Sequence, residues 1–360
     1  MEVQNMNKNK LPLLPPTAEL ETKLVMKQLV KANKAVAELK GYSETIPNKH
    51  ILINAITINE AKDSSAIENI ITTHDDLYKA LSETSKASTS AKEVINYRTA
   101  LWLGYEQIQK REMLTTNMIV EIQSEIENNR AGIRKLPGTT LKNQSTGETI
   151  YTPPEGEKEI RDLLANLEKY INEDNDDIDP LIKLAVIHYQ FECIHPFYDG
   201  NGRTGRIINI LYLVLKKLFD SPILYLSRYI NRNKAQYYRL LQEVRNTESW
   251  EDWIVYILKG IEETAIETLE LIKRISTEIV NMSKEIKERL PKIYSKELID
   301  LLFFEFYTKT IFIENGLNVS RNTAVSYLKA LEKEGFLVSE KLGIERVYQN
   351  KRLYDMVRYD

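Results

Sequence analysis

The chain has little that would tie it to a secreted or membrane setting. Among its 360 residues there is one cysteine, Cys193, so an intramolecular disulfide and a cysteine-based zinc site are both excluded. The densest apolar run, from Ile207 to Leu215, ends at two lysines and is too short to cross a bilayer. The first residues are polar and basic, unlike a signal peptide. We therefore expect a cytoplasmic protein without a membrane partner.

An excess of charge of one sign is also missing. Lys and Arg number 49 and Asp and Glu 52, a net charge of −3, so the chain as a whole does not attract nucleic acid. Glycine and proline are sparse, at 13 and 11, and several of them gather between residues 128 and 155. Elsewhere apolar residues recur at helical spacing. The sequence predicts a mainly α protein of two or three domains.

Two buried helices are expected to meet at a tight loop over residues 195–202. Asp179 is a good N-cap and Pro180 fits the first position of a helix that runs to Cys193. The second helix begins near Asn201 or Gly202, and the apolar run that follows is too dense for a surface helix.

This loop and the start of the second helix carry residues suited to phosphate binding, metal binding and proton transfer. Its glycines would let the backbone approach a ligand, and the helix start offers N–H groups that suit a phosphate. Two arginines three residues apart can grip phosphate oxygens. A carboxylate suits Mg²⁺, and a histidine can take a proton near pH 7. These groups predict a phosphate-transferring enzyme, and they are Gly200, Gly202, Gly205, Arg203, Arg206, Asp199 and His195.

Eight positions of residues 195–206 match a family motif. The motif H-x-F-x-(D/E)-G-N-G-R-x-x-R is that of the Fic family, which this chain resembles at His195, Phe197, Asp199, Gly200, Asn201, Gly202, Arg203 and Arg206. The resemblance implies a protein adenylyltransferase that moves AMP from ATP to Tyr, Thr or Ser hydroxyls of target proteins, itself included.

The resemblance also implies a role for each motif residue. His195 would be the base, and Asp199 would hold Mg²⁺. The ATP phosphates would be bound by Asn201, Gly202, Arg203, Thr204, Gly205 and Arg206, with the Asn201 side chain at the α-phosphate. Tyr237 matches the position that packs on adenine, although a tyrosine there could equally belong to the core.

A second motif lies in the segment of residues 51–70. Ser64, Glu68 and Asn69 match (S/T)-x-x-x-E-(G/N), which in Fic proteins marks an inhibitory helix. The resemblance implies that Glu68 pairs with Arg206 and blocks the γ-phosphate. The residues alone allow another interpretation, because Ser65-x-x-Glu68 could be a capping box at a helix start.

A hairpin is expected between the two motifs. Strand-like pieces at Thr139–Lys142 and Thr149–Thr152 flank the turn at 145–147. In Fic proteins such a flap holds the target by strand addition, so Thr149, Ile150, Tyr151 and Thr152 would bind the target. The alternative is an ordinary surface hairpin.

Two other features are expected to be structural. His188 is expected to be a packed structural histidine, and the acidic residues 173–177 are expected to form a solvated turn.

The C-terminal part resembles a winged-helix domain. Trp250 to Leu290 reads as two helices, and after Pro291 the pattern is helix, helix, helix, hairpin. Residues 293–360 carry ten basic and ten acidic residues, which leaves DNA, protein or dimer contact open. The side chains expected to face a groove are Arg321, Asn322, Ser326 and Lys329.

Together these patterns predict a linear order of domains. Residues 1–110 form an N-terminal helical region with the inhibitory helix at about 51–70. Residues 111–250 are the Fic core with a flap at about 139–154, 251–291 a helical connector, and 292–360 the winged-helix domain. Two further functions stay open: removal of AMP using Glu68, and a DNA-binding regulator that carries a Fic module. A homodimer is a fair expectation.

Overall fold

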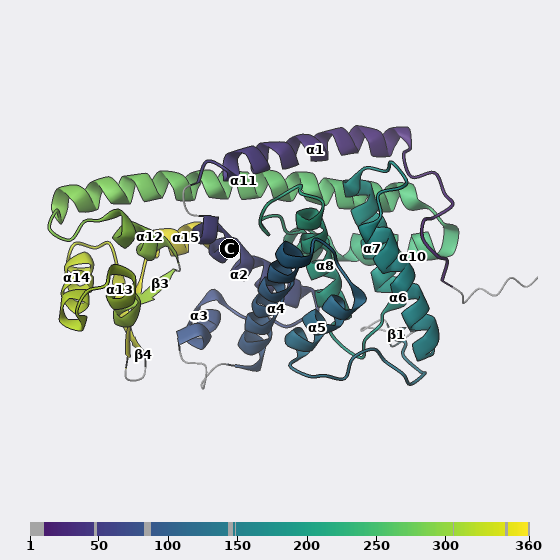
Figure 1. Ribbon diagram of the computed structural model, residues 1–360, viewed down its shortest axis with the longest axis horizontal. Coiled ribbons are helices and arrows are strands. Elements are labelled where there is room, and N and C mark those ends of the chain that lie inside the picture. Colours follow the sequence, from purple (N-terminus) through teal and green to yellow (C-terminus); the bar gives the residue numbers. More distant parts are fainter. Residues whose placement is uncertain are drawn as a thin grey trace, which may run out of the picture. The chain divides into compact units, whose positions relative to one another are not determined.

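The computed structural model describes residues 11–46, 49–82, 88–142, 147, 149–304, 306–342 and 345–358 (Figure 1). The polar tail before residue 11, the turn at 145–146 and the wing turn at Gly343 lie outside the described residues. The chain groups into two compact units, Met1–Lys34 with Asn96–Glu262, and Ala35–Ile95 with Glu263–Asp360. Three helices contribute residues to both units: α1 (Lys23–Ser43), α4 (Thr89–Arg111) and α11 (Trp250–Arg289).

The first unit is built around two adjacent buried helices, α7 (Pro180–Ile194) and α8 (Asn201–Leu215). The expected start of α7 is confirmed, because the Asp179 carboxylate accepts a hydrogen bond from the Leu181 N–H and Pro180 occupies the first turn. The other elements are α5 (Thr116–Glu127), β1 (Leu141–Lys142), β2 (Thr149–Tyr151), α6 (Glu157–Asn172), α9 (Ser227–Arg232) and α10 (Lys234–Thr247).

Glycines allow the helices of this unit to approach closely. A Cβ atom on Gly205 of α8 would lie 3.0 Å from Cδ1 of Phe191 on α7. A Cβ on Gly104 of α4 would lie 2.5 Å from Cδ1 of Leu211 on α8. Gly205 therefore serves helix packing, and approach of a ligand to its backbone stays a prediction.

The chain between Leu11 and Pro16 lies against this unit as an irregular strap. Leu11 and Leu14 are buried. The Gln190 amide donates to the Pro12 carbonyl at 2.8 Å. The Asn166 side chain accepts from the Leu14 N–H at 2.7 Å and donates to its carbonyl at 3.0 Å. These contacts pack the strap against the body of the unit.

The second unit holds the N-terminal helices α2 (Lys49–Ile67) and α3 (His74–Ser82) and the C-terminal domain. In that domain the Ser320 hydroxyl caps α14 at the Thr323 N–H, and an antiparallel sheet runs in the order β3-β5-β4. β3 and α15 were not expected from the sequence. The elements are α12 (Lys296–Phe304), β3 (Tyr307–Lys309), α13 (Thr310–Leu317), α14 (Arg321–Lys333), β4 (Val338–Leu342), β5 (Glu345–Gln349) and α15 (Lys351–Val357).

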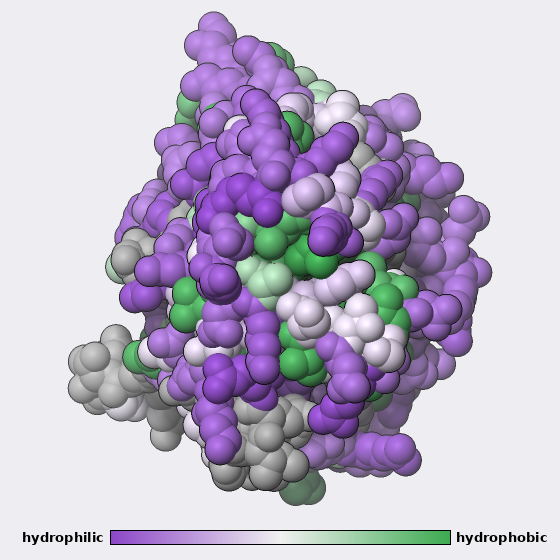
Figure 2. Space-filling model, turned by 90° about the vertical axis from the view of Figure 1, so that its left-hand side faces the viewer, coloured by the Kyte–Doolittle hydropathy of each residue, from purple (hydrophilic) through white to green (hydrophobic). Residues whose placement is uncertain are grey.

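The surface around the C-terminal domain is mostly hydrophilic. Figure 2 shows polar side chains around a few apolar ones near the centre of this face. Arg321, Asn322, Ser326 and Lys329 of α14 are exposed, as expected. Exposed apolar side chains of this domain are Phe304, Ile311, Phe312 and Val338.

One helix differs from the expectation. α11 is one helix of 40 residues rather than two. Gly260 within it marks a close contact, because a Cβ there would lie 2.7 Å from the Tyr229 ring. α1 runs past Gly41 to Ser43. Among the described residues, none of the helices combines the length and apolar character needed to span a bilayer.

Candidate active site

His195 lies where α7 turns into the loop. It is the C-cap of α7, with a left-handed backbone at φ 47°, and its N–H donates to the Phe191 carbonyl at 3.0 Å. Few non-glycine residues adopt this conformation, so the surrounding contacts must hold it. The turn places the imidazole at the junction of the two core helices.

The Asn201 side chain locks the loop between these helices. Its Oδ1 accepts from the Phe197 N–H at 2.8 Å and its Nδ2 donates to the Phe197 carbonyl at 2.9 Å. The side chain is 3% exposed. Both amide atoms thus hold the loop, and contact of this side chain with the α-phosphate stays a prediction.

The start of α8 has the geometry of an anion site. Gly200, with φ 75°, turns the chain into the helix. The first helical bond joins the Thr204 N–H to the Gly200 carbonyl at 2.9 Å. The N–H groups of residues 201–203 therefore have no acceptor within the helix, and they carry the positive end of its dipole.

Electrostatics keep His195 neutral. The pKa of His195 is lowered to about 4, first by burial and then by the nearby positive charges of Arg134 and Arg245, against smaller opposing effects of the Glu192 backbone and Asp199. Its Nδ1 is buried without a hydrogen-bond partner within the described ranges. At pH 7 the imidazole is thus neutral, with one unprotonated ring nitrogen that can act as a base.

Asp199 is an exposed residue of the loop at 195–202, and its Oδ1 accepts a hydrogen bond from the Gly200 N–H at 2.7 Å. No group of three or more His, Cys, Asp or Glu side chains in the described part of the chain could hold a metal by itself. A single carboxylate fits Mg²⁺ that is bound mainly through substrate phosphates.

The two motif arginines lie inside the protein. Each is 3% exposed. Nη2 of Arg203 lies 2.6 Å from Oε1 of Glu127 at the end of α5. The pKa of the His188 imidazole is lowered to about 3, first by burial and then by the positive charge of nearby Arg206.

Tyr237 belongs to an aromatic cluster. It is 2% exposed, and its hydroxyl lies 2.9 Å from Nε2 of His188. The Trp253 ring stacks on His188 with the two planes 12° apart. The structural role expected for His188 is confirmed. This burial favours the core interpretation of Tyr237, and its contact with adenine stays a prediction.

The flap hairpin is present, with Leu141 opposite Tyr151 and Lys142 opposite Thr149. Thr149, Ile150 and Thr152 are exposed. The Tyr151 hydroxyl donates to the Cys193 carbonyl at 2.9 Å, and the Arg245 guanidinium lies 3.7 Å from the centre of the Tyr151 ring. The flap is thus tied to the last turn of α7, while target binding by its strands stays a prediction.

Sequence reasoning missed several charged and polar residues that contact the loop. Glu127, Arg134 and Arg245 contact residues 193–203, and Tyr198 joins this loop to the backbone of Lys135. Only Tyr198 lies within the motif, at a variable position. Glu127, Arg134 and Arg245 each contact a residue of this segment that is more than 50 positions away in the sequence. No local sequence pattern could therefore identify them.

The inhibitory motif lies at the end of a helix. α2 ends at Ile67, and Asn69 has a left-handed backbone at φ 65°. The Ile70 N–H donates to the Ser65 carbonyl at 3.1 Å and the Asn69 N–H to the Ala66 carbonyl at 3.0 Å. These two bonds form a Schellman C-cap. The capping-box interpretation, which needs a helix start, is therefore wrong.

The motif's three residues are placed differently at this helix end. Ser64 is buried, Glu68 is half-buried and Asn69 is exposed. They belong to the second unit, whereas Arg206 belongs to the first. Pairing of Glu68 with Arg206 stays a prediction.

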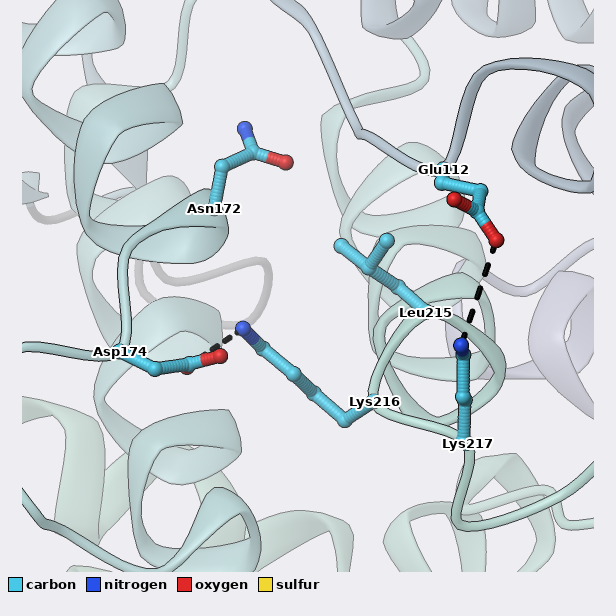
Figure 3. A pocket seen from close by; sticks show the side chains of 6 residues that line it. All are labelled: Glu112, Asn172, Asp174, Leu215, Lys216 and Lys217. Atoms are coloured by element: carbon cyan, nitrogen blue, oxygen red, sulfur yellow. Dashed lines mark hydrogen bonds and ion pairs between the residues drawn. The ribbon is translucent and has the colours of Figure 1, made fainter.

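A polar pocket of about 290 Å³ lies at the other end of α8 (Figure 3). Lys216 pairs with Asp174 at 2.6 Å, and Lys217 with Glu112 at 4.0 Å. α8 is fifteen residues long, so this end lies about 20 Å from the start of the helix. The acidic turn thus pairs with lysines, and this pocket is separate from the motif loop.

Three family models match the chain. They are described as Fic/DOC family N-terminal at residues 26–106, Fic/DOC family at 113–213, and Protein adenylyltransferase SoFic-like, C-terminal domain, at 279–353. The two Fic/DOC matches together cover just over half of the chain. The chain belongs to the Fic family.

Curated relatives and solved structures agree with this. "Protein adenylyltransferase Fic" of Nematostella vectensis is 25% identical over 56% of this chain and 46% of its own. "Protein adenylyltransferase fic-1" of Caenorhabditis elegans is 28% identical over 36% of this chain and 24% of its own. The chain spans less than half the length of each relative.

Among solved structures, a Fic family protein from Desulfovibrio desulfuricans G20 has a TM-score of 0.57 at 18% identity, covering 93% of this chain and 98% of its own. Fic-1 (aa134 - 508) from C. elegans has a TM-score of 0.55 at 22% identity, covering 69% of this chain and 74% of its own. These likenesses show the Fic fold.

Proposed function

We propose that this protein transfers AMP from ATP to hydroxyl groups of target proteins. The observation that carries the proposal is the junction of α7 and α8, where a neutral His195 adjoins the N–H groups that open α8. The relatives named protein adenylyltransferase support the same reaction.

In this reaction a target Tyr, Thr or Ser hydroxyl gives its proton to His195 while its oxygen attacks the α-phosphorus of ATP. The new O–P bond forms as the bond to the β-phosphate breaks, and pyrophosphate leaves. N–H groups at residues 201–203 stabilise charge on the α-phosphate, and Arg203 and Arg206 bind the departing phosphates. Mg²⁺, held by Asp199, would neutralise phosphate charge.

Regulation by Glu68 is part of the proposal. A carboxylate that pairs with Arg206 would withdraw one phosphate ligand and add negative charge where the triphosphate must lie. Ser64 and Asn69 would hold the helix end that presents Glu68. The supporting observation is that the motif residues form one ordered helix terminus.

The test is incubation with Mg²⁺ and ATP labelled on the α-phosphate, with and without added lysate. We compare the natural chain with Glu68→Gly, His195→Ala and the double variant. Strong labelling by Glu68→Gly alone is expected. Equal labelling by the natural chain would remove the inhibitory role of Glu68, and labelling by the double variant would remove His195 as the base. ATP labelled on the γ-phosphate is the control for phosphate transfer.

A further inference from the structure

Arg134 contacts the motif loop at several points. The residue is 0% exposed. Its Nε donates to the His195 carbonyl at 2.8 Å. Its Nη2 donates to the Pro154 carbonyl and, at 3.4 Å, to the Ile194 carbonyl. Its backbone N–H donates to the Pro196 carbonyl at 2.9 Å.

These acceptors belong to two separate segments, the turn that carries His195 and the exit of the flap. Ile194, His195 and Pro196 form the turn that aims the imidazole. Pro154 ends the segment that leaves the second flap strand. One guanidinium therefore joins the exit of the flap to the residue in the left-handed conformation, which needs such contacts to persist.

The entrance of the flap is held at the same loop. The Tyr198 hydroxyl accepts from the N–H groups of Lys135 and Leu136 at 3.0 and 3.3 Å. The Glu155 carboxylate accepts from the Gly138 N–H at 2.9 Å, which closes the base of the hairpin. The flap and the loop thus share anchors at both ends of the hairpin.

From this geometry we infer that Arg134 is a positioning residue, which sets the flap and the His195 backbone in one fixed relation. A target strand laid on the flap would then present its hydroxyl at a set place relative to the imidazole. The inference rests on the proposed function for its catalytic consequence, though the shared anchor itself does not. Only a planar fork can reach both segments at once, so lysine would be a poor substitute.

The kinetic test uses Arg134→Lys in the Glu68→Gly background, with AMP transfer to a fixed target as readout. Misplacement of the base predicts a fall in kcat of about tenfold or more. KM for ATP and ATP binding measured by calorimetry should be unchanged, because Arg134 does not contact the start of α8. A kcat within twofold of the parent, or a loss of ATP binding in step with kcat, overturns the inference.

Arg130→Lys is the matched control, since Arg130 is exposed and lies four residues earlier. A further variant, Arg134→Ala, leaves space for a small cation. Ethylguanidinium should restore part of its activity, whereas ethylammonium should not. Equal rescue by both ions would mean that charge alone matters, and would overturn the role of the fork.

Hydrogen exchange tests the shared anchor without any activity, and so separates its failure from failure of AMP transfer. In Arg134→Lys, amides of residues 149–152 and of 194–198 should exchange faster together, and those of α6 should not. Faster exchange in one segment alone, or in all helices of the unit, overturns the inference.

Discussion

The carboxylate of Glu127 lies 2.6 Å from the guanidinium of Arg203, and the two residues are 76 positions apart. Both are mostly buried, with side chains 14% and 3% exposed. The same carboxylate covers Gly200, where a Cβ would come within 2.5 Å of Oε1. The last turn of α5 therefore holds the first motif arginine and requires glycine at the start of α8.

Glu127→Gln should lower the free energy of unfolding by about 3 kcal/mol, because it removes the charge that offsets a buried guanidinium. MgATP should recover more stability in this variant than in the natural chain, since phosphate supplies the missing negative charge. Urea unfolding with and without MgATP measures both effects.

The control is Glu121→Gln, an exposed residue of the same helix that accepts a hydrogen bond from Gln107. We expect this variant to stay within about 0.5 kcal/mol of the natural chain. If both variants unfold alike, the pair with Arg203 adds nothing to stability.

We expect the rate of AMP transfer to stay nearly constant as the pH is lowered from neutral into the acidic range. The neutral form of His195 accepts the proton, and its pKa is lowered to about 4, so protonation removes the base only as the pH falls through that value. An imidazole with the usual pKa would be half protonated near pH 6.5. We expect kcat of Glu68→Gly at saturating MgATP to be nearly constant from pH 7.5 to about 5.5. A twofold fall centred near pH 6.5 would contradict the pKa.

Asn69 should be replaceable by glycine but not by valine. Its φ of 65° costs glycine nothing, whereas a β-branched residue is strained there by about 1–2 kcal/mol. Asn69→Gly should thus keep the low basal transfer of the natural chain. Asn69→Val should disturb the end of α2 and raise transfer toward that of Glu68→Gly. Labelling assays compare Asn69→Gly, Asn69→Val and Glu68→Gly. Identical activity in both Asn69 variants would mean that the C-cap of α2 has no effect on inhibition.

Asn350 should be a stability determinant of the C-terminal domain. It is 1% exposed, its Oδ1 caps α15 at the Leu353 N–H, and its Nδ2 donates to the Leu302 carbonyl at 3.1 Å. Asn350→Ala leaves a buried carbonyl unpaired and removes a cap, which should cost about 2–3 kcal/mol. Thermal unfolding measures the loss, with the exposed Asn322→Ala as control. A shift no larger than that of Asn322→Ala would show that the carbonyl finds another donor.

Local patterns predicted much of the fold. Asp179 and Pro180 start α7, and α8 begins at Asn201, both as expected. Capping and periodicity depend on residues within one or two turns, so the sequence contains them directly. They failed at α11, which runs as one helix of 40 residues, and the contact of its Gly260 with the distant Tyr229 ring was not visible in any local pattern.

The sequence by itself determined the family motif, its place between two buried helices, and the chemistry that His195, Asp199 and the start of α8 can offer. The tertiary structure decided how those groups are held. It paired Arg203 with the Glu127 carboxylate and bound Arg134 to the His195 carbonyl. It also bound the Asn201 amide to the Phe197 backbone and buried Tyr237 beside His188. Most of these contacts join residues tens of positions apart, and only packing of whole helices brings such residues together.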